Sequence, residues 1–154
     1  MLIKAPSREF GFSLVEALVA LVVLSVGMIG IAALHGQSLG AARTAQYRSV
    51  AIVLASDMAD RIRLNRTAQA AYMGAAVNNN CNAGGGATCA PAALAAYDLW
   101  VWNQEVAQRL PGGASQVVFN GGTNPPTYTI NVSWSEVGQA LPVAYQLVFQ
   151  QPGF

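Results

Sequence analysis

The sequence predicts an α+β fold, in which the second half of one long N-terminal helix packs on a small antiparallel β-sheet with a short second helix beside it. Three observations lead to this prediction. An uncharged apolar run lies near the N-terminus, helical periodicity continues beyond it, and three strand-like runs separated by turn residues lie near the C-terminus. A long amphipathic helix and a three-stranded sheet each leave an apolar face exposed when alone, so we expect them to pack together.

The apolar run, residues 17–34, contains no charged side chain. As a helix it would be roughly 27 Å long, which is enough to cross a bilayer. Lys4 and Arg8 precede it and favour a cytoplasmic N-terminus, with the remaining chain exported. No proline interrupts the run, and Gly27 and Gly30 are its only helix-weakening residues.

Helical periodicity continues after this run, which predicts one helix from about residue 12 to about residue 71. Apolar side chains recur at intervals of three or four residues: Tyr47, Val50, Leu54, Met58 and Ile62. Such a helix would be roughly 90 Å long, far more than a bilayer needs. Its second half therefore requires cover from the C-terminal part of the chain.

An irregular loop and a second helix are predicted next. Residues 75–90 are rich in Asn, Gly and Ala, which is typical of a loop. A helix is expected to begin at Pro91 and to end before Pro111. One face of this helix is apolar: Leu99, Trp102, Val106 and Leu110.

Three strands are predicted at residues 116–120, 128–134 and 144–150. In the middle run, alternate residues are apolar: Tyr128, Ile130, Val132 and Trp134. Period-two alternation places these side chains on one face of the sheet, which we expect to lie on the long helix.

The two cysteines, Cys81 and Cys89, enclose a short segment of a domain expected to be exported. An oxidising compartment favours a disulfide between them, which would stabilise the fold by about 2–3 kcal/mol in the chain-entropy picture. A metal site is disfavoured, because the spacing is not that of a zinc knuckle and His35 belongs to the membrane boundary.

The charge balance argues against nucleic-acid binding. Charged residues make up only 10% of the chain. The one basic cluster, Arg61, Arg63 and Arg66, lies three or four residues from Asp57 and Asp60, which can pair with it on one helical face.

Few residues are suited to catalysis or to a cofactor. His35 is the only histidine, and Lys4 is the only lysine. Asp98 and Glu105 could form a carboxylate pair, but they are seven residues apart on a short helix with Trp102 between them, and no second signature of sugar chemistry accompanies them. The three tryptophans, Trp100, Trp102 and Trp134, are interpreted as packing residues. We therefore expect a protein that is not an enzyme and holds no cofactor or metal.

Residues 10–16 (FGFSLVE), preceded by basic residues and followed by the apolar helix, resemble the class III leader of type IV pilins and pseudopilins. The resemblance implies that a prepilin peptidase cleaves between Gly11 and Phe12 and methylates the new N-terminus of Phe12. It divides the chain into a leader (residues 1–11), a transmembrane assembly segment (12–34) and a periplasmic globular domain (35–154). Loss of the leader removes Lys4, Arg8 and Glu9 and leaves equal numbers of acidic and basic side chains.

Three further segments, residues 58–66, 110–113 and 128–134, are similar to type IV pilus minor pilins of the PilV type. This resemblance implies a structural subunit that helps to prime or cap a pilus from the inner membrane and ends in the pilus at or near its tip. The implied partners are other minor pilins and the major pilin through the N-terminal helix, the prepilin peptidase and a tip adhesin.

Glu16 is the candidate assembly residue. An ionised carboxylate in a membrane helix costs several kcal/mol unless it is paired or reaches the interface. In a bundle of such helices, the N-terminal amine of a neighbouring Phe12 can neutralise it. The alternative is a snorkelling residue that only contacts headgroups.

Two other functions remain open at this stage. A pseudopilin of a type II secretion system would share the leader, Glu16 and the domain. A single-pass signal-anchor protein with a periplasmic ligand-binding domain would instead keep residues 1–11.

Overall fold

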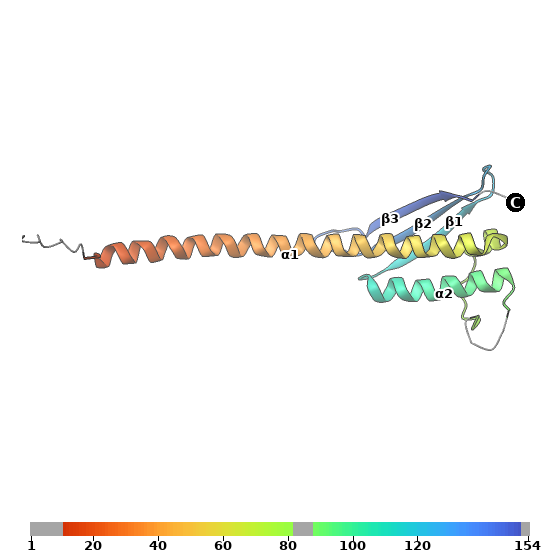
Figure 1. The fold of residues 1–154 in the computed structure, drawn as a ribbon, viewed down its shortest axis with the longest axis horizontal. Coiled ribbons are helices and arrows are strands. Elements are labelled where there is room, and N and C mark those ends of the chain that lie inside the picture. Colours follow the sequence, from red (N-terminus) through yellow and green to blue (C-terminus); the bar gives the residue numbers. More distant parts are fainter. Residues whose placement is uncertain (1–10, 82–87, 152–154) are drawn as a thin grey trace, which may run out of the picture. The chain divides into compact units, whose positions relative to one another are not determined.

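The computed structural model describes residues 11–81 and 88–151. The chain divides into two compact units, Met1–Ala42 and Arg43–Phe154. Helix α1 (Leu14–Leu64) contributes to both units. The second unit also contains the 3-10 segment η1 (Arg66–Met73), helix α2 (Pro91–Arg109) and three strands. This is the α+β arrangement that the sequence predicts (Figure 1).

In the first unit, α1 passes through Gly27 and Gly30 without a break. The Ser25 hydroxyl donates to the carbonyl of Val22 at 2.8 Å, so this polar group is satisfied within the helix itself. The apolar half of α1 is therefore a regular helix, as its composition predicts.

The prediction that this helix reaches about residue 71 is wrong. Asn65 leaves helical geometry (φ −109, ψ 56), and η1 follows with non-helical backbone at Gln69. The Asn65 side chain donates to the carbonyl of Pro91 at 2.8 Å, which ties the helix end to the start of α2. The change of direction also brings Ala68 and Tyr72 into the core. These tertiary contacts outweigh the helical preference of the Ala-rich sequence that follows Asn65.

Helix α2 begins at Pro91 and ends before Pro111, as predicted. The indole nitrogen of Trp102 donates to the carbonyl of Leu54 at 2.9 Å, which joins α2 to α1. The described part of the preceding loop is irregular, as expected, and the Val77 amide donates to the carbonyl of Ala96 at 3.0 Å.

The three strands, β1 (Ala114–Asn120), β2 (Thr127–Trp134) and β3 (Val143–Gln150), form an antiparallel sheet in the order β1-β2-β3. The register pairs Val117 with Ile130, and Ile130 with Leu147. The inner face of β2 is buried, as its alternation predicts: Tyr128, Ile130, Val132 and Trp134.

A single core lies between the C-terminal half of α1, the sheet and α2. Leu54 and Met58 are almost fully buried in it, while Tyr47 and Val50 pack at its margin. Both the sheet and α2 therefore cover the amphipathic half of α1, which explains how so long a helix is stabilised outside a membrane.

We expect Leu54→Ala to destabilise the second unit by about 2–5 kcal/mol, because it removes a buried side chain and leaves a cavity. The matched control is Val53→Ala, since Val53 is 58% exposed on the same helix and its loss should cost less than about 0.5 kcal/mol. Denaturant unfolding of the full chain in detergent, followed by tryptophan fluorescence, measures both. Equal effects of the two substitutions would contradict the packing described for α1.

Candidate functional site

Gly11 and Phe12 lie directly before α1, whose first helical residue is Leu14. Both are exposed. A Cβ atom added at Gly11 would meet no described atom within 4 Å. Packing of the described chain therefore does not require glycine at this position.

Glu16 lies in the first turn of α1 and is exposed. The positive end of the helix dipole favours a carboxylate there. Within residues 11–81 and 88–151, no ion pair or hydrogen bond involves its side chain. Because an ionised carboxylate is costly in hydrocarbon, Glu16 needs a partner from another molecule or contact with headgroups once α1 is in a membrane.

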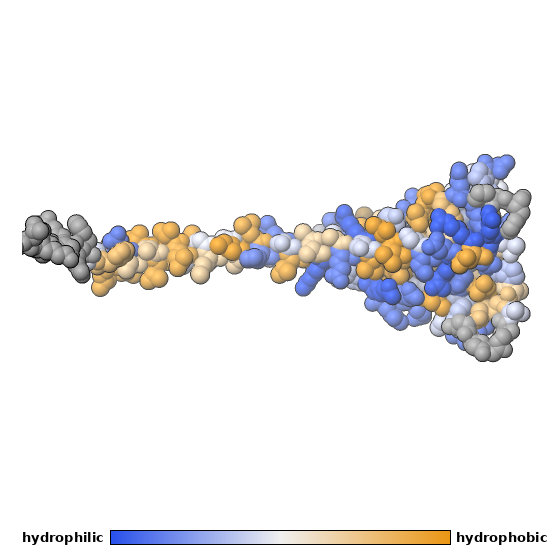
Figure 2. All heavy atoms as spheres, viewed as in Figure 1, coloured by the Kyte–Doolittle hydropathy of each residue, from blue (hydrophilic) through white to orange (hydrophobic). Residues whose placement is uncertain are grey.

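The surface of α1 over residues 17–34 carries no charge and is largely apolar on all sides. Its large apolar side chains are each more than half exposed, with Ile29 at 72%. Figure 2 shows hydrophobic atoms over most of this segment. By length and composition α1 can cross a membrane, and its apolar window is entirely unburied. A helix that is hydrophobic all round is stable only in a bilayer or against other apolar helices.

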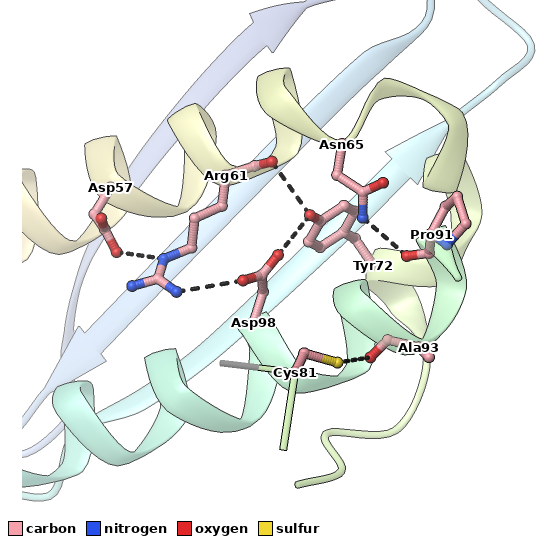
Figure 3. Close-up of polar contacts among 8 residues, drawn as sticks. All are labelled: Asp57, Arg61, Asn65, Tyr72, Cys81, Pro91, Ala93 and Asp98. Carbon is pink, nitrogen blue, oxygen red and sulfur yellow. Dashed lines mark hydrogen bonds and ion pairs between the residues drawn. The ribbon is translucent and has the colours of Figure 1, made fainter. Parts of the chain in front are cut away.

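The second unit contains a polar cluster that joins α1, η1 and α2 (Figure 3). Arg61 lies 2.8 Å from Asp57 (Nε to Oδ2) and 3.3 Å from Asp98 (Nη1 to Oδ1). The Tyr72 hydroxyl donates to the other carboxylate oxygen of Asp98 at 2.9 Å. Asp98 is buried, and each of its carboxylate oxygens has a partner within the protein. A buried carboxylate needs such partners because water cannot solvate it.

These contacts shift the pKa values of two members of the cluster. Burial alone would lower the pKa of Arg61, but hydrogen bonds and charges from Asp57 and Asp98 outweigh it and raise the pKa. Burial raises the pKa of Tyr72 well above its usual range, and the bond to Asp98 adds to this effect. Arg61 therefore stays charged and Tyr72 neutral at ordinary pH, which suits a structural cluster rather than acid–base chemistry.

The remaining basic and acidic candidates have structural contacts. Arg63 pairs with Asp60 at 2.7 Å, as the spacing predicts. The structure does not make Asp98 and Glu105 a pair, because the partners of Asp98 are Arg61 and Tyr72. Across the described residues, no three His, Cys, Asp or Glu side chains gather as a metal site requires.

The tryptophans pack in the second unit. Trp102 and Trp134 are at most 1% exposed. Trp134 donates to Glu136 at 2.9 Å, and Trp100 stacks near Tyr97 with ring centroids 6.0 Å apart. These contacts explain all three tryptophans without a ligand.

Cys81 and Cys89 form a disulfide with a Cα–Cα distance of 5.8 Å. The bridged segment includes residues 82–87, which lie outside the described residues. Next to the bridge, the Asn79 side chain donates to the carbonyl of Ala93 at 2.9 Å. The bridge thus lies beside the first turns of α2.

Sequence reasoning missed the roles of Asn65 and Tyr72. Asn65 carried one usable signal, because Asn is unfavourable inside helices and common at their ends. Tyr72 carried none, since its partner Asp98 lies 26 residues away in sequence.

The stability of the second unit should fall as the pH rises above about 10, the ordinary tyrosine pKa. The unfolded chain then releases the Tyr72 proton while the folded chain retains it, so alkaline pH favours unfolding. Tyr72→Phe should reduce the steepness of this fall without abolishing it, because burial also raises the pKa of Tyr128. Denaturant unfolding from pH 7 to 11 measures the slope, with Tyr145→Phe as the control. An unchanged slope in Tyr72→Phe would contradict the assignment.

Two family models match adjacent parts of the chain. Residues 6–32 match the prokaryotic N-terminal methylation motif. Residues 33–100 match the family described as type IV pilin Tt1218. The first match contains Gly11, Phe12 and Glu16, and the second extends from α1 into α2. Searches of curated proteins and of solved structures found no match.

The type IV pilin family is a family of structural subunits and not of enzymes. The methylation-motif match includes the exposed residues before α1, and the pilin-family match includes the residues of the polar cluster. The methylation motif, the pilin-family match and the fold of a long helix on a small sheet together support a type IV pilin subunit.

Proposed function

We propose that this chain is a minor pilin of the PilV type, a non-catalytic subunit that is held in the inner membrane and helps to prime a type IV pilus. The observation that carries the proposal is Glu16, a carboxylate that has no partner among the described residues and lies at the head of an unburied apolar helix. The apolar surface of such a helix is covered in a bilayer or in a bundle of similar helices, and a neighbouring helix can also supply a partner for Glu16.

In this proposal, residues 1–11 are a leader, and a prepilin peptidase cleaves it between Gly11 and Phe12. The exposure of both residues supports access by the peptidase. A Cβ atom added at Gly11 would meet no described atom within 4 Å, so we expect a block caused by substitution there to arise at the peptidase. Methylation of the Phe12 amine then completes the mature N-terminus.

Cleavage would give each subunit a cation that the precursor lacks at this position. In a bundle of helices, the amine of Phe12 from one subunit reaches Glu16 of its neighbour. In low dielectric, such a pair is far stronger than it would be in water, and an unpaired carboxylate is costly. The pair therefore favours addition of a subunit next to one already placed.

The division of the chain follows from the same scheme. Residues 12–34 are the membrane and assembly segment, and residues 35–154 form the periplasmic domain. The disulfide supports an oxidising compartment for that domain. The resemblance of residues 58–66, 110–113 and 128–134 to PilV-type pilins supports a minor subunit near the tip, with other minor pilins, the major pilin and a tip adhesin as partners.

Gly11→Val should block processing in a host that contains a prepilin peptidase. Intact mass should show that the native chain begins at N-methylated Phe12, whereas the variant keeps residues 1–11. Gly27→Val is the matched control, because Gly27 also has open space around it and lies away from the junction. If the native chain stays uncut in an active host, a signal-anchor protein with a periplasmic ligand-binding domain replaces this proposal.

Glu16→Gln should leave cleavage intact and lower incorporation of the subunit into pili by more than about ten-fold, since loss of one partner of a buried pair costs about 3–5 kcal/mol. Immunoblots of sheared pili and of membranes measure the ratio of assembled to membrane-held subunit. Glu105→Gln, on α2, is the control and should assemble normally. Normal assembly of Glu16→Gln would support the snorkelling alternative. Incorporation of the native chain only into a type II secretion pseudopilus would make it a pseudopilin instead.

A further inference from the structure

A hollow of about 330 Å³ lies in the second unit, beside the end of α1 and the end of β3. The described residues that line it all carry side-chain hydrogen-bond donors: Arg63, Arg66, Gln150 and Gln151. We propose that this arginine–glutamine hollow binds an acidic residue of a partner polypeptide. The carboxylate would contact the guanidinium of Arg63, and the adjoining main chain would contact the side-chain amide of Gln151.

Gln151 is the residue that points to a ligand. It is only 8% exposed, yet neither its side-chain nitrogen nor its side-chain oxygen has a hydrogen-bond partner among the described residues. Its main chain is held in place, because its N–H donates to the carbonyl of Pro126 at 3.0 Å. A buried amide without partners is unfavourable. The side chain therefore suits a group that the described chain does not supply.

The chemistry of this amide defines what the ligand must carry. A glutamine side chain offers N–H donors and a carbonyl acceptor, so a ligand that satisfies both ends needs an acceptor and a donor close together. An acidic residue within a polypeptide has both, in its carboxylate and its main-chain N–H. The last torsion of a glutamine side chain is soft, so the Gln151 amide can turn toward such a ligand at little cost.

Arg63 is positioned to hold the carboxylate. Its Nη1 lies 2.7 Å from Oδ1 of Asp60, and its guanidinium lies over the Phe149 ring, 4.8 Å from the ring centroid. These two contacts restrict where the guanidinium can be. Asp60 uses one of five N–H donors, so others are available to a ligand. The side chain is 54% exposed, which leaves it within reach of a partner.

The charges at the hollow favour a carboxylate over a phosphate. Arg66, the first residue of η1, adds a second guanidinium and also has a contact within the chain. Asp60 already offsets the charge of Arg63. A carboxylate adds one negative charge, whereas a phosphate group adds roughly −1.5 to −2 near pH 7. The smaller charge is the better match to a basic pair that already includes an aspartate.

The end of α1 offers a simpler role for the arginines. Cations in the last turn of a helix stabilise it through the helix dipole, and this effect accounts for Arg63 without any ligand. It does not account for Gln151, whose side chain is uncharged and buried. The inference of a ligand therefore depends on the amide and the hollow, and the arginines determine that the ligand is an anion.

The test uses the full-length chain in detergent micelles and two peptides with blocked ends, Gly-Gly-Asp-Gly-Gly and Gly-Gly-Asn-Gly-Gly. Each peptide is added up to about 20 mM, which reveals dissociation constants in the millimolar range. The NMR signals of the Gln151 side-chain amide and of the Arg63 Nε–H should shift and saturate with the Asp peptide. The Asn peptide should cause little shift, because it lacks the charge that a guanidinium binds strongly.

Gln151→Met should weaken binding of the Asp peptide by about three- to ten-fold, because it removes hydrogen bonds to the ligand. The same substitution should raise the denaturant midpoint of the free chain, since it removes a buried amide that has no partner among the described residues. Gln116→Met is the matched control. Gln116 is exposed on β1, so its loss should change neither quantity.

Arg63→Gln should weaken binding of the Asp peptide by about two- to five-fold, as expected for a partly exposed ion pair. Arg109→Gln is the matched control, because Arg109 is exposed in the last turn of α2 and lies away from the hollow. It should bind the peptide as the native chain does.

Four results would overturn the inference: no shift with the Asp peptide, equal shifts with both peptides, tighter binding of inorganic phosphate than of the Asp peptide, or a lower denaturant midpoint in Gln151→Met. Binding that appears only in a chain ending at Gln151 would also overturn it, by assigning the hollow to residues 152–154. None of these outcomes depends on cleavage at Gly11 or on pilus growth, so failure here is distinguishable from failure of the minor-pilin proposal.

Discussion

The burial of one face of α1 between Ala51 and Ile62 is the interaction on which the whole second unit depends. This face is the common surface for the sheet and for α2, and its residues are almost completely inaccessible to water. A three-stranded sheet is marginally stable alone, and an isolated helix gains little from propensity. Each element therefore relies on the others, and loss of the α1 surface would expose all of them together.

Polar contacts fix how η1 and α2 are positioned against α1. Asp98 connects α2 to Arg61 on α1 and to Tyr72 in η1, while Asn65 holds the start of α2. Such contacts add modest net stability, because each exchanges hydrogen bonds with water for hydrogen bonds within the chain. They matter for geometry, since a buried carboxylate tolerates only arrangements in which both of its oxygens have partners.

Unlike the second unit, the first unit leaves its apolar surface exposed. Nothing in the described chain covers this surface or pairs with Glu16. The second unit buries its apolar core within itself. It shares helix α1 with a segment whose apolar surface is covered only by lipids or by other helices. Subunits of a helical bundle need both properties.

The sequence by itself determined the apolar half of α1, the amphipathic half, α2 and the three strands. Each is encoded by local periodicity or by a short motif, which neighbouring residues alone specify. With only two cysteines, the pairing of Cys81 with Cys89 followed as well.

Only the tertiary structure decided that α1 ends at Leu64, since Asn65 leaves the helix to reach Pro91. It also decided the contact of Tyr72 with Asp98, the order of the strands and which strands lie at the edges of the sheet. These features depend on which distant residues meet, and that is set by the path of the chain around its core rather than by any local pattern.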